Sequence, residues 1–360
     1  MKTFDEVFID KTKYGVKVQT SEYGEQGEHI IIDQGQSQIA GYTDREEGLF
    51  EEVPVVIFGD HTRVVKYVDE PFFLGADGVK VLRSEDENAN YKYLYYALKN
   101  AKIPNTGYNR HFKWLKEVKI NYPDSNKQAE IVEVLDHVSD IISKREAELQ
   151  TLDELIKARF VELFGDGNYP QTPLIQLIVE GAGLSYGIIV PGDNVEEGVP
   201  MVRPSDFKND ELCLDNVYKV ASEIEAKYAR TRLIGDEILV QVIGQPGQIM
   251  LSDSRCKGMN VTRNLAVVRP DHNRINRIYL KAYMQTQEAQ VFMLGETKQS
   301  TLKQLPLSRL KELEVPVPPM VVQNQFAAFV EQTDKSKVVV QKALEKMQYL
   351  FDSLMQEYFG

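Results

Sequence analysis

Two stretches of the chain place apolar residues at every seventh position, a spacing typical of long helices that pair with another helix. The first, over about residues 126–164, has this line at Leu135, Ile142, Leu149, Ile156 and Leu163. The second, over about 321–358, has it at Val330, Leu344, Phe351 and Tyr358, with Leu354 beside it. Neither stretch contains Gly or Pro, so the sequence predicts two helices of roughly 55–60 Å each.

Shorter apolar runs on either side of a Gly-containing turn predict two β-hairpins. One runs from Val55 to Val65 and turns through Gly59-Asp60-His61-Thr62-Arg63. The other runs from Ile238 to Ile249 and turns through Gly244-Gln245-Pro246-Gly247. Each hairpin belongs to a mixed region of strands and helices that leads into one of the long helices.

The two halves of the chain repeat each other. Residues 115–165 align without a gap on residues 310–360, with ten identities in 51 positions, among them Pro123 with Pro318 and Gln128 with Gln323. Upstream, Tyr93-Leu94 resembles Tyr279-Leu280. The second globular region is the longer one, and the alignment predicts that the missing length lies at the start of the first. An internal repeat of this kind fixes the architecture.

The repeat predicts an α+β protein with two mixed α/β domains and two long helices that form an antiparallel coiled coil, related by a pseudo-twofold. We expect a first domain over 1–120, a first helix over 121–165, a second domain over 166–315 and a second helix over 316–360. Two helices in one chain meet at high effective concentration, although a coil between chains stays open as an alternative. The seam is expected at Leu135, Ile142, Leu149, Ile156, Leu344, Phe351 and Leu354; Arg145, Arg159, Thr333 and Lys337 interrupt it.

Composition indicates a globular protein that does not coat nucleic acid unaided. Of the 360 residues, 42% are hydrophobic and 27% charged, which suits ordinary cores, but the net charge is −12. DNA binding needs clustered Lys and Arg, so it would have to rest on a local patch or on a partner. Cys213 and Cys256 stand far apart, and no signal peptide or membrane span is indicated. We therefore expect a cytoplasmic protein.

In its order of motifs the chain resembles the specificity subunit of type I restriction-modification systems. Two variable domains each close on Leu-Lys-Glu, a Pro-containing turn, a Gln and a long helix. Val315-Pro316-Val317-Pro318-Pro319 before Gln323 is similar to the start of that family's second conserved helix. The segments around Gln34-Gly35-Gln36, Phe58–Arg63, Gly107–Lys113 and Gly235–Val240 resemble its target-recognition domains. Asn121-Tyr122-Pro123-Asp124 departs from the pattern, because it lacks the double proline.

The resemblance implies a non-catalytic subunit without cofactor or metal. Such a subunit reads a bipartite, asymmetric double-stranded DNA site, one half-site per domain, and the helices fix the gap between the half-sites. It assembles two methyltransferase subunits and two restriction subunits. The alternative that the residues leave open is a scaffold whose paired domains bind proteins or small ligands. With a net charge of −12, the chain is expected to bind DNA tightly only together with its partners.

The candidate DNA contacts lie at the hairpin turns and just before the shared segments. Residues 99–119 are the most basic stretch, with Tyr108 and Trp114 interleaved; a solvated loop is the plainer interpretation. Arg and Gln can read guanine and adenine edges, whereas Lys more often contacts phosphate. The candidates are Arg63, Lys66, Arg110, His111, Lys113, Gln245, Gln248, Lys298 and Gln299.

Several kinds of active site are missing from the sequence. It has no Asn-Pro-Pro-aromatic or Asp-Pro-Pro-Tyr tetrapeptide of adenine methyltransferases and no phosphate-binding GxxxxGK[ST] loop. Glu117-Val118-Lys119 has the form of a nuclease metal site, but the repeat places Glu312-Leu313-Glu314 there. The five histidines are scattered. We therefore expect no catalytic residue in this chain.

Overall fold

The structure is a computed structural model that describes residues 1–75, 77–107, 109–165, 167–208, 211–295 and 304–360. The chain forms two compact units. Unit 1 contains residues 1–148 and 340–360, and unit 2 contains residues 149–339. Among the described residues, no helix has the length and apolar composition needed to cross a bilayer.

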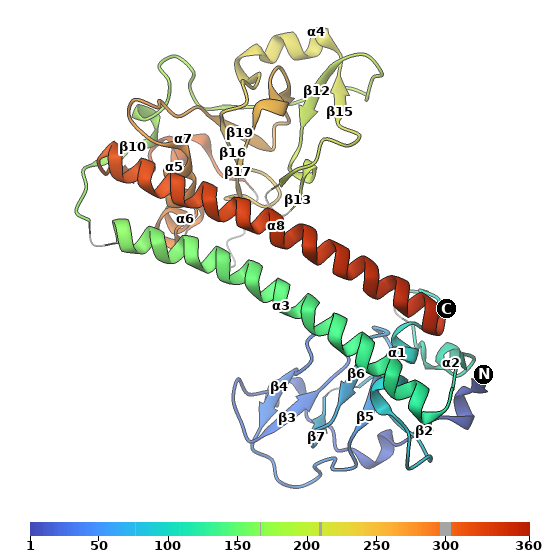
Figure 1. The fold of residues 1–360 in the computed structure, drawn as a ribbon. Coiled ribbons are helices and arrows are strands. Elements are labelled where there is room, and N and C mark those ends of the chain that lie inside the picture. The colour runs from blue at the N-terminus through green and yellow to red at the C-terminus, as the bar shows by residue number, and fades with distance from the viewer. Residues whose placement is uncertain (76, 108, 166, 209–210, 296–303) are drawn as a thin grey trace. The chain divides into compact units, whose positions relative to one another are not determined.

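Unit 1 contains three small sheets (Figure 1). A four-stranded antiparallel sheet has the order β2 (Ile9–Asp10), β8 (Val79–Arg83), β5 (Val55–Gly59), β6 (Val65–Val68). A three-stranded sheet has the order β4 (Gly41–Thr43), β3 (His29–Ile32), β7 (Phe72–Leu74), and β1 (Lys2–Thr3) pairs with β9 (Lys119–Ile120). The helices are α1 (Tyr91–Lys99) and α2 (Phe112–Leu115). Strand β5 is apolar throughout because both of its faces are buried.

Unit 2 repeats these sheets strand for strand. Its four-stranded sheet has the order β11 (Ser185–Tyr186), β19 (Leu265–Val268), β16 (Ile238–Gln241), β17 (Ile249–Leu251). Its three-stranded sheet has the order β15 (Tyr218–Val220), β12 (Val199–Val202), β18 (Asn260–Val261), and β10 (Gln171–Pro173) pairs with β20 (Glu314–Pro316). The helices α5 (Arg277–Met284) and α7 (Leu307–Lys311) correspond to α1 and α2. The parallel pair of each three-stranded sheet also recurs, β3 with β7 and β12 with β18.

Most of the extra length of the second half does not lie where the alignment predicted. The first strands β1 and β2 are present and pair like β10 and β11, so the first half has its counterparts of these strands. The additional elements are internal to unit 2: the hairpin of β13 (Phe207–Lys208) and β14 (Glu211–Leu212), and the helices α4 (Ser222–Glu225) and α6 (Gln287–Leu294). A gap in a weak repeat cannot be placed from identities alone.

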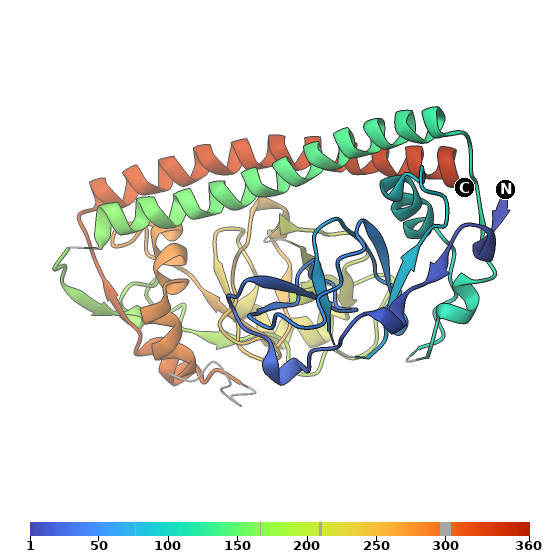
Figure 2. The same cartoon turned by 90° about the horizontal axis from the view of Figure 1, so that it is seen from below.

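The two long helices are α3 (Ser125–Phe164) and α8 (Met320–Phe359), as the heptad spacing predicted. In unit 1 the beginning of α3 packs on the end of α8, where Leu135, Ile142, Phe351 and Leu354 join one apolar cluster. In unit 2 the end of α3, including Ile156 and Phe160, packs near the beginning of α8 at Phe326 and Val330. The helices therefore run antiparallel in each unit, side by side in both views (Figures 1 and 2). The coiled coil within one chain is confirmed.

The remaining seam residues and the polar interruptions are also accommodated. Leu149 and Leu344 are half-buried and lie near the limits of the units. Lys337 donates from Nζ to Asp153 Oδ1 at 2.6 Å, which joins the two helices in unit 2. The Arg159 guanidinium lies 5.7 Å from the centre of the Phe329 ring. Lys337 and Arg159 thus find partners on the facing helix, whereas Arg145 pairs with Glu148 and Thr333 donates to the Phe329 carbonyl within their own helices.

Candidate nucleic-acid interface

The turn between β5 and β6 is a tight loop closed by backbone hydrogen bonds. The N–H of Arg63 donates to the Gly59 carbonyl at 2.7 Å, and the N–H of Gly59 donates to the Val64 carbonyl at 2.8 Å. Arg63 adopts a positive φ of 62°, which is uncommon outside glycine. Its side chain is half-buried and donates from Nη1 to the Ile103 carbonyl at 3.3 Å. The arginine is thus held between the hairpin and the segment after α1.

Asp60 fastens the start of α2 to this turn. Its carbonyl accepts from the His111 N–H at 2.7 Å, and its Oδ1 accepts from the Phe112 N–H at 2.7 Å. The Asp60 N–H in turn donates to the Gly78 carbonyl at 2.7 Å, which ties in the loop before β8. Arg110 and Lys113, on either side of the fastened residues, are exposed. The structure therefore brings Arg63, Arg110 and Lys113 into one region.

Two of the candidates face inward, which corrects the expectation that they contact DNA directly. Lys66 is 2% exposed, and its Nζ donates to the Ser37 carbonyl at 2.6 Å and lies 3.5 Å from Asp33 Oδ1. Burial lowers the pKa of Lys66, and Asp33 only partly offsets this. His111 is fully buried, and its Nδ1 lies 3.0 Å from the Asp60 carbonyl, which can only accept, so Nδ1 donates. Both side chains support the region rather than face solvent.

Sequence patterns missed three lysines that the structure places beside this region. Lys80 Nζ lies 4.7 Å from the centre of the Phe112 ring, next to the residue that Asp60 holds. Lys13 and Lys17 line the same groove as Lys80. Lys13 and Lys17 lie close together in the sequence, beside Lys11, but Lys80 comes from a distant segment, so no local run joins the three. The only hint is β8 itself, where Lys80 is half-buried between two buried valines.

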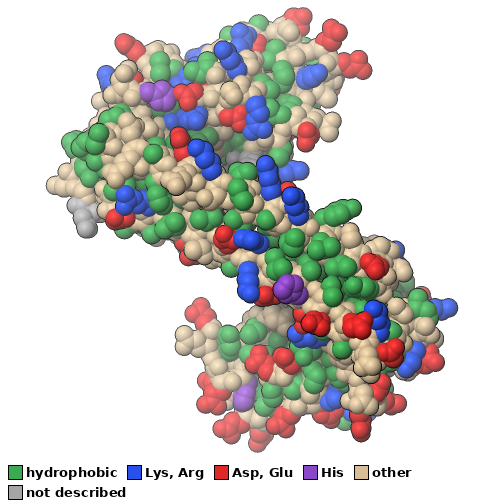
Figure 3. Space-filling model, in the orientation of Figure 1, with side chains coloured by type: hydrophobic (Ala, Val, Ile, Leu, Met, Phe, Trp, Pro, Cys, Tyr) green, Lys and Arg blue, Asp and Glu red, His purple; other side chains and the backbone are tan. Residues whose placement is uncertain are grey.

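Charge is distributed unevenly over unit 1. On the face that Figure 3 shows, acidic side chains gather over the part that contains β3 and β4, whereas Lys and Arg side chains follow the long helices. The exposed acids of that part include Glu25, Glu28, Asp44, Glu46 and Glu47. The exposed cations Lys99, Lys102, Arg110, Lys113, Lys116 and Lys119 lie in the segment around α2. An acidic chain therefore still carries a local positive patch.

The corresponding turn of unit 2, between β16 and β17, presents glutamines instead of arginine. Its closing bonds run from the Gln241 N–H to the Gln248 carbonyl at 2.8 Å and from the Gly247 N–H to the Gln241 carbonyl at 2.9 Å. Gln245 and Gln248 are exposed. Gly247 has a φ of +92°, and a Cβ there would lie 2.6 Å from Gln290 Oε1, so the turn requires glycine.

The segment before α7 is fastened to this turn much as the segment before α2 is in unit 1. The Leu305 N–H donates to the Val242 carbonyl at 2.8 Å, and Ile243 forms a bridge with Gln304. Gln304 Nε2 also donates to the Tyr186 hydroxyl at 3.3 Å. The candidates Lys298 and Gln299 lie outside the described residues.

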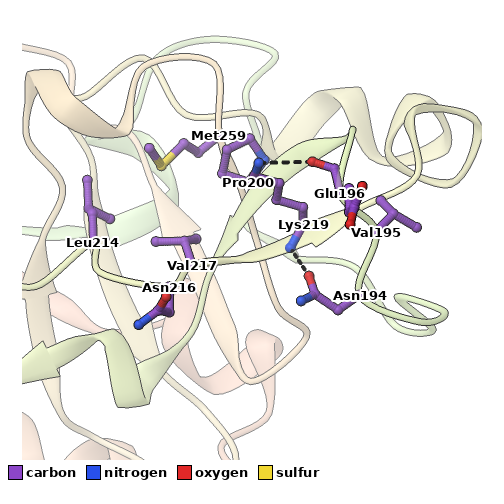
Figure 4. A pocket seen from close by; sticks show the side chains of 9 residues that line it. All are labelled: Asn194, Val195, Glu196, Pro200, Leu214, Asn216, Val217, Lys219 and Met259. Carbon is purple, nitrogen blue, oxygen red and sulfur yellow. Dashed lines mark hydrogen bonds between the residues drawn. The ribbon is translucent and has the colours of Figure 1, made fainter.

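Unit 2 also contains a surface cavity of about 520 Å³ beside β12 and β15 (Figure 4). Lys219 crosses it, with its N–H on Asn194 Oδ1 at 2.8 Å and its Nζ on the Glu196 carbonyl at 3.0 Å. Both polar groups of this lysine are thus used within the protein. In the described part of the chain, no three His, Cys, Asp or Glu side chains are placed to hold a metal ion.

Comparison with known proteins gives consistent results. The specificity subunit of type I restriction enzyme EcoBI from Escherichia coli is 24% identical over 348 residues, covering 86% of this chain and 73% of the relative. The EcoR124I/EcoR124II specificity subunit of Escherichia coli is 22% identical, covering 90% and 83%. The solved S subunit of a type I restriction-modification system from M. genitalium has a TM-score of 0.62 at 19% identity, covering 100% and 95%. A chain from a structure on assembly of the type I R-M system has a TM-score of 0.52 at 15% identity, covering 99% and 95%.

The solved structures share the fold, and a family model extends the likeness to the sequence. The model described as the type I restriction modification DNA specificity domain matches twice, over residues 6–152 and 192–346. One match falls in each copy of the repeat, and together they span most of the chain. The chain therefore belongs to the type I restriction-modification DNA specificity family.

Proposed function

We propose that this chain is the DNA-reading subunit of a type I restriction-modification complex and that each unit reads one half of a bipartite, asymmetric site. One observation carries the proposal: the same sheet topology occurs twice, but the corresponding turns present different side chains. Unit 1 presents Arg63 beside Arg110 and Lys113, and unit 2 presents Gln245 and Gln248. Two readers with unlike side chains recognise unlike half-sites, as dimeric readers recognise like ones.

The chemistry of these residues suggests a division of roles. The arginines can pair with guanine and the glutamines with adenine through two hydrogen bonds in the major groove. Lys113 can hold a phosphate and so orient the domain without reading sequence. Lys298 and Gln299 precede α7 as Arg110 precedes α2, and they are assigned to the same interface by that position alone. The long helices would set the distance between the half-sites.

Catalysis belongs to other subunits in this proposal. Two methyltransferase subunits and two restriction subunits would assemble on the chain, in the cytoplasm where the DNA lies. The relatives described above are specificity subunits of type I restriction enzymes, which supports this arrangement. The positive surfaces of the partner subunits would compensate for the net charge of −12.

A domain exchange tests the proposal most directly. Residues 1–118 are replaced by the corresponding segment of another specificity subunit, and the genome-wide methylation pattern is mapped in cells that carry the partner subunits. We expect one half of the methylated motif to change and the other half and the gap to stay the same. An exchange of residues 166–309 serves as the matched control and should alter only the other half.

A scaffold that binds proteins or small ligands predicts a different result. Neither exchange would then change any methylation pattern, and deletion of the gene would leave the map as it was. Either outcome would refute the proposed function.

A further inference from the structure

Unit 1 contains a groove that the sequence did not suggest. It has a volume of about 660 Å³ and is lined by Asp10, Thr12, Lys13, Gly15, Lys17 and Lys80. Its walls are the single helical turn Thr12–Tyr14 after β2 and the start of β8. Three of its six lining residues are lysines, in a chain whose acidic residues outnumber its basic ones.

The one carboxylate of the groove wall is used internally. Asp10 Oδ2 accepts from Lys80 Nζ at 2.9 Å, while Asp10 Oδ1 accepts from the Thr12 N–H at 2.9 Å and also from the Thr12 hydroxyl. Asp10 therefore fixes Lys80 and the helical turn in place. Lys80 also lies over the Phe112 ring, and Asp60 holds the Phe112 N–H. The groove is thus attached to the turn and to the segment that carries Arg110 and Lys113.

Lys17 forms an exposed ion pair with a carboxylate, and another anion can take the place of that carboxylate. Its partner is Asp77, whose side chain is 88% exposed, and Lys17 itself is 43% exposed. The pKa of Asp77 is lowered chiefly by Lys17 and further by the charge of Arg110, which places Arg110 within electrostatic reach of the same carboxylate. Ion pairs this exposed contribute little to stability. An incoming anion can replace Asp77 at little cost.

We propose that this groove binds a backbone phosphate of the DNA duplex next to the half-site read by unit 1. The inference rests on the proposed function and assigns a second, sequence-independent contact to it. Ammonium groups suit a phosphate, which lysine holds as a point charge, better than a base edge, which arginine and glutamine match in shape. The phosphate would fix how unit 1 sits on the duplex without adding to what it reads.

The same loop of unit 2 lacks this chemistry. After β11, where unit 1 has its lysines, the chain carries Ile189, 51% exposed, and Val190, 70% exposed. Arg263 N–H donates to the Ile188 carbonyl at 2.9 Å, so this loop also lies next to the turn before its sheet's second strand. Among the described residues, the lysine groove therefore has no counterpart at this loop of unit 2, where Arg263 is the exposed cation.

The test is the double charge reversal Lys13→Glu with Lys17→Glu in the full chain, assembled with its methyltransferase subunits. DNA binding is measured over a range of salt concentrations, on a duplex carrying the methylated motif and on one of unrelated sequence. We expect Kd to rise about tenfold on both duplexes and the slope of log Kd against log salt to become shallower by about 1 for each phosphate that the groove no longer neutralises. The methylated motif should not change.

Matched variants sharpen the test. Asp77→Asn removes the competing carboxylate and should tighten binding on both duplexes. Arg45→Glu reverses another exposed cation of unit 1, which pairs with Glu22 at 3.4 Å, and should leave Kd within about twofold. An unchanged Kd and salt slope in the double variant would overturn the phosphate site, and so would a changed motif, because the groove would then read bases.

Two further measurements distinguish a failure of the phosphate site from a failure of the proposed function. Replacing chloride by inorganic phosphate at constant ionic strength should weaken DNA binding by wild type more than by the double variant, because free phosphate competes for the same lysines; equal weakening would count against the groove as a phosphate site. If the wild-type complex shows no preference for the methylated motif, the proposed function itself fails, whatever the variant does.

Discussion

Units 1 and 2 keep the same bonds between domain and long helix but differ on the surfaces that would meet DNA. The Tyr93 hydroxyl donates to the Asn121 carbonyl at 2.7 Å, and the Tyr279 hydroxyl donates to the Pro316 carbonyl at 2.8 Å. Gln128 and Gln323 each donate to the carbonyl of the proline five residues earlier at 2.8 Å. Every acceptor is a main-chain oxygen, which any residue supplies. The two units thus share the hydrogen bonds that end on main-chain carbonyls, and they differ in the side chains that face outward.

The two units differ in the apolar packing at the junction, where the end of a long helix meets the globular part of the unit. In unit 2 the Phe164 ring lies 4.7 Å from Tyr279, 5.0 Å from Phe160 and 5.6 Å from Phe326. In unit 1 the corresponding Phe359 lies 5.2 Å from the Tyr93 ring. Unit 1 also has a polar bond, with the Tyr96 hydroxyl on Asp136 Oδ1 at 2.7 Å. The unit 2 junction therefore depends more on aromatic burial.

The largest effect expected from this comparison is that of Phe164→Ala. Removing a buried ring with three aromatic neighbours should lower the free energy of unfolding of unit 2 by about 3–5 kcal/mol. Phe359→Ala should cost unit 1 only about 1–2 kcal/mol, since Phe359 is half-buried near a helix end. Urea unfolding followed by circular dichroism reports both units. The fluorescence of Trp114, the one tryptophan of the chain, reports unit 1.

Val161→Ala is the control for the aromatic pair, because Val161 is 64% exposed on the same helix turn and should change stability by less than about 0.5 kcal/mol. Phe164→Ala should shift the circular dichroism transition and leave the Trp114 transition nearly in place. Equal losses for the two phenylalanine variants would contradict the difference between the junctions.

A second, smaller difference is a buried carboxylate at the residue that directly precedes β16 in unit 2. Glu237, just before β16, accepts from the N–H groups of Ile234 at 2.7 Å and Asp236 at 3.0 Å and from the Ser252 hydroxyl at 2.7 Å, whereas Pro54 precedes β5 in unit 1. Burial alone would raise the pKa of Glu237, but these donors outweigh it and the pKa is lowered. The charged form therefore stabilises the fold.

Glu237→Gln should destabilise unit 2 by about 2 kcal/mol at neutral pH, because an amide N–H then faces main-chain N–H groups, which can only donate. A lowered pKa gives stability that is present above the ordinary glutamate value of about 4.3 and is lost as the pH falls through the folded value. The difference between wild type and variant should thus vanish in acid. Glu223→Gln, on an exposed residue, should show no such dependence. A pH-independent difference would refute the role of the charge.

The long helices and hairpins were predictable because their signals are local. A seven-residue spacing over 40 residues identifies α3 and α8, and an apolar run before a Gly-containing turn identifies β5 and β16. The ungapped alignment after residue 115 fixed the correspondence of the two halves. The positions of β13–β14 and α6 could not be predicted, since the insertions have no counterpart against which to align them.

Site residues were predictable only where exposure follows from sequence position. Gln245 and Gln248 flank a glycine at a turn and are exposed, as such residues usually are. Lys66 lies on β6 opposite Ile57, and its burial depends on Asp33 and on the Ser37 carbonyl, from a segment about thirty positions earlier. The lysine groove likewise joins residues 13, 17 and 80. Tertiary partners decide these cases, and no local pattern encodes them.

The smallest expected effect concerns what the two turns read. Gln245→Ala with Gln248→Ala should cost about 1 kcal/mol in preference for the unit 2 half-site and leave the salt dependence of binding unchanged, because neutral side chains release no counterions. Arg110→Ala with Lys113→Ala should instead make the salt slope shallower by about 1 for each phosphate left without its cation. Arg45→Ala, which alters an exposed cation paired with Glu22, is the control and should change neither quantity. Each variant is measured in the assembled complex, with half-site duplex libraries for preference and a salt series for slope. If the glutamine pair changed the slope, or the cation pair altered only the unit 2 half-site, the assignment of unlike chemistry to the two units would be wrong.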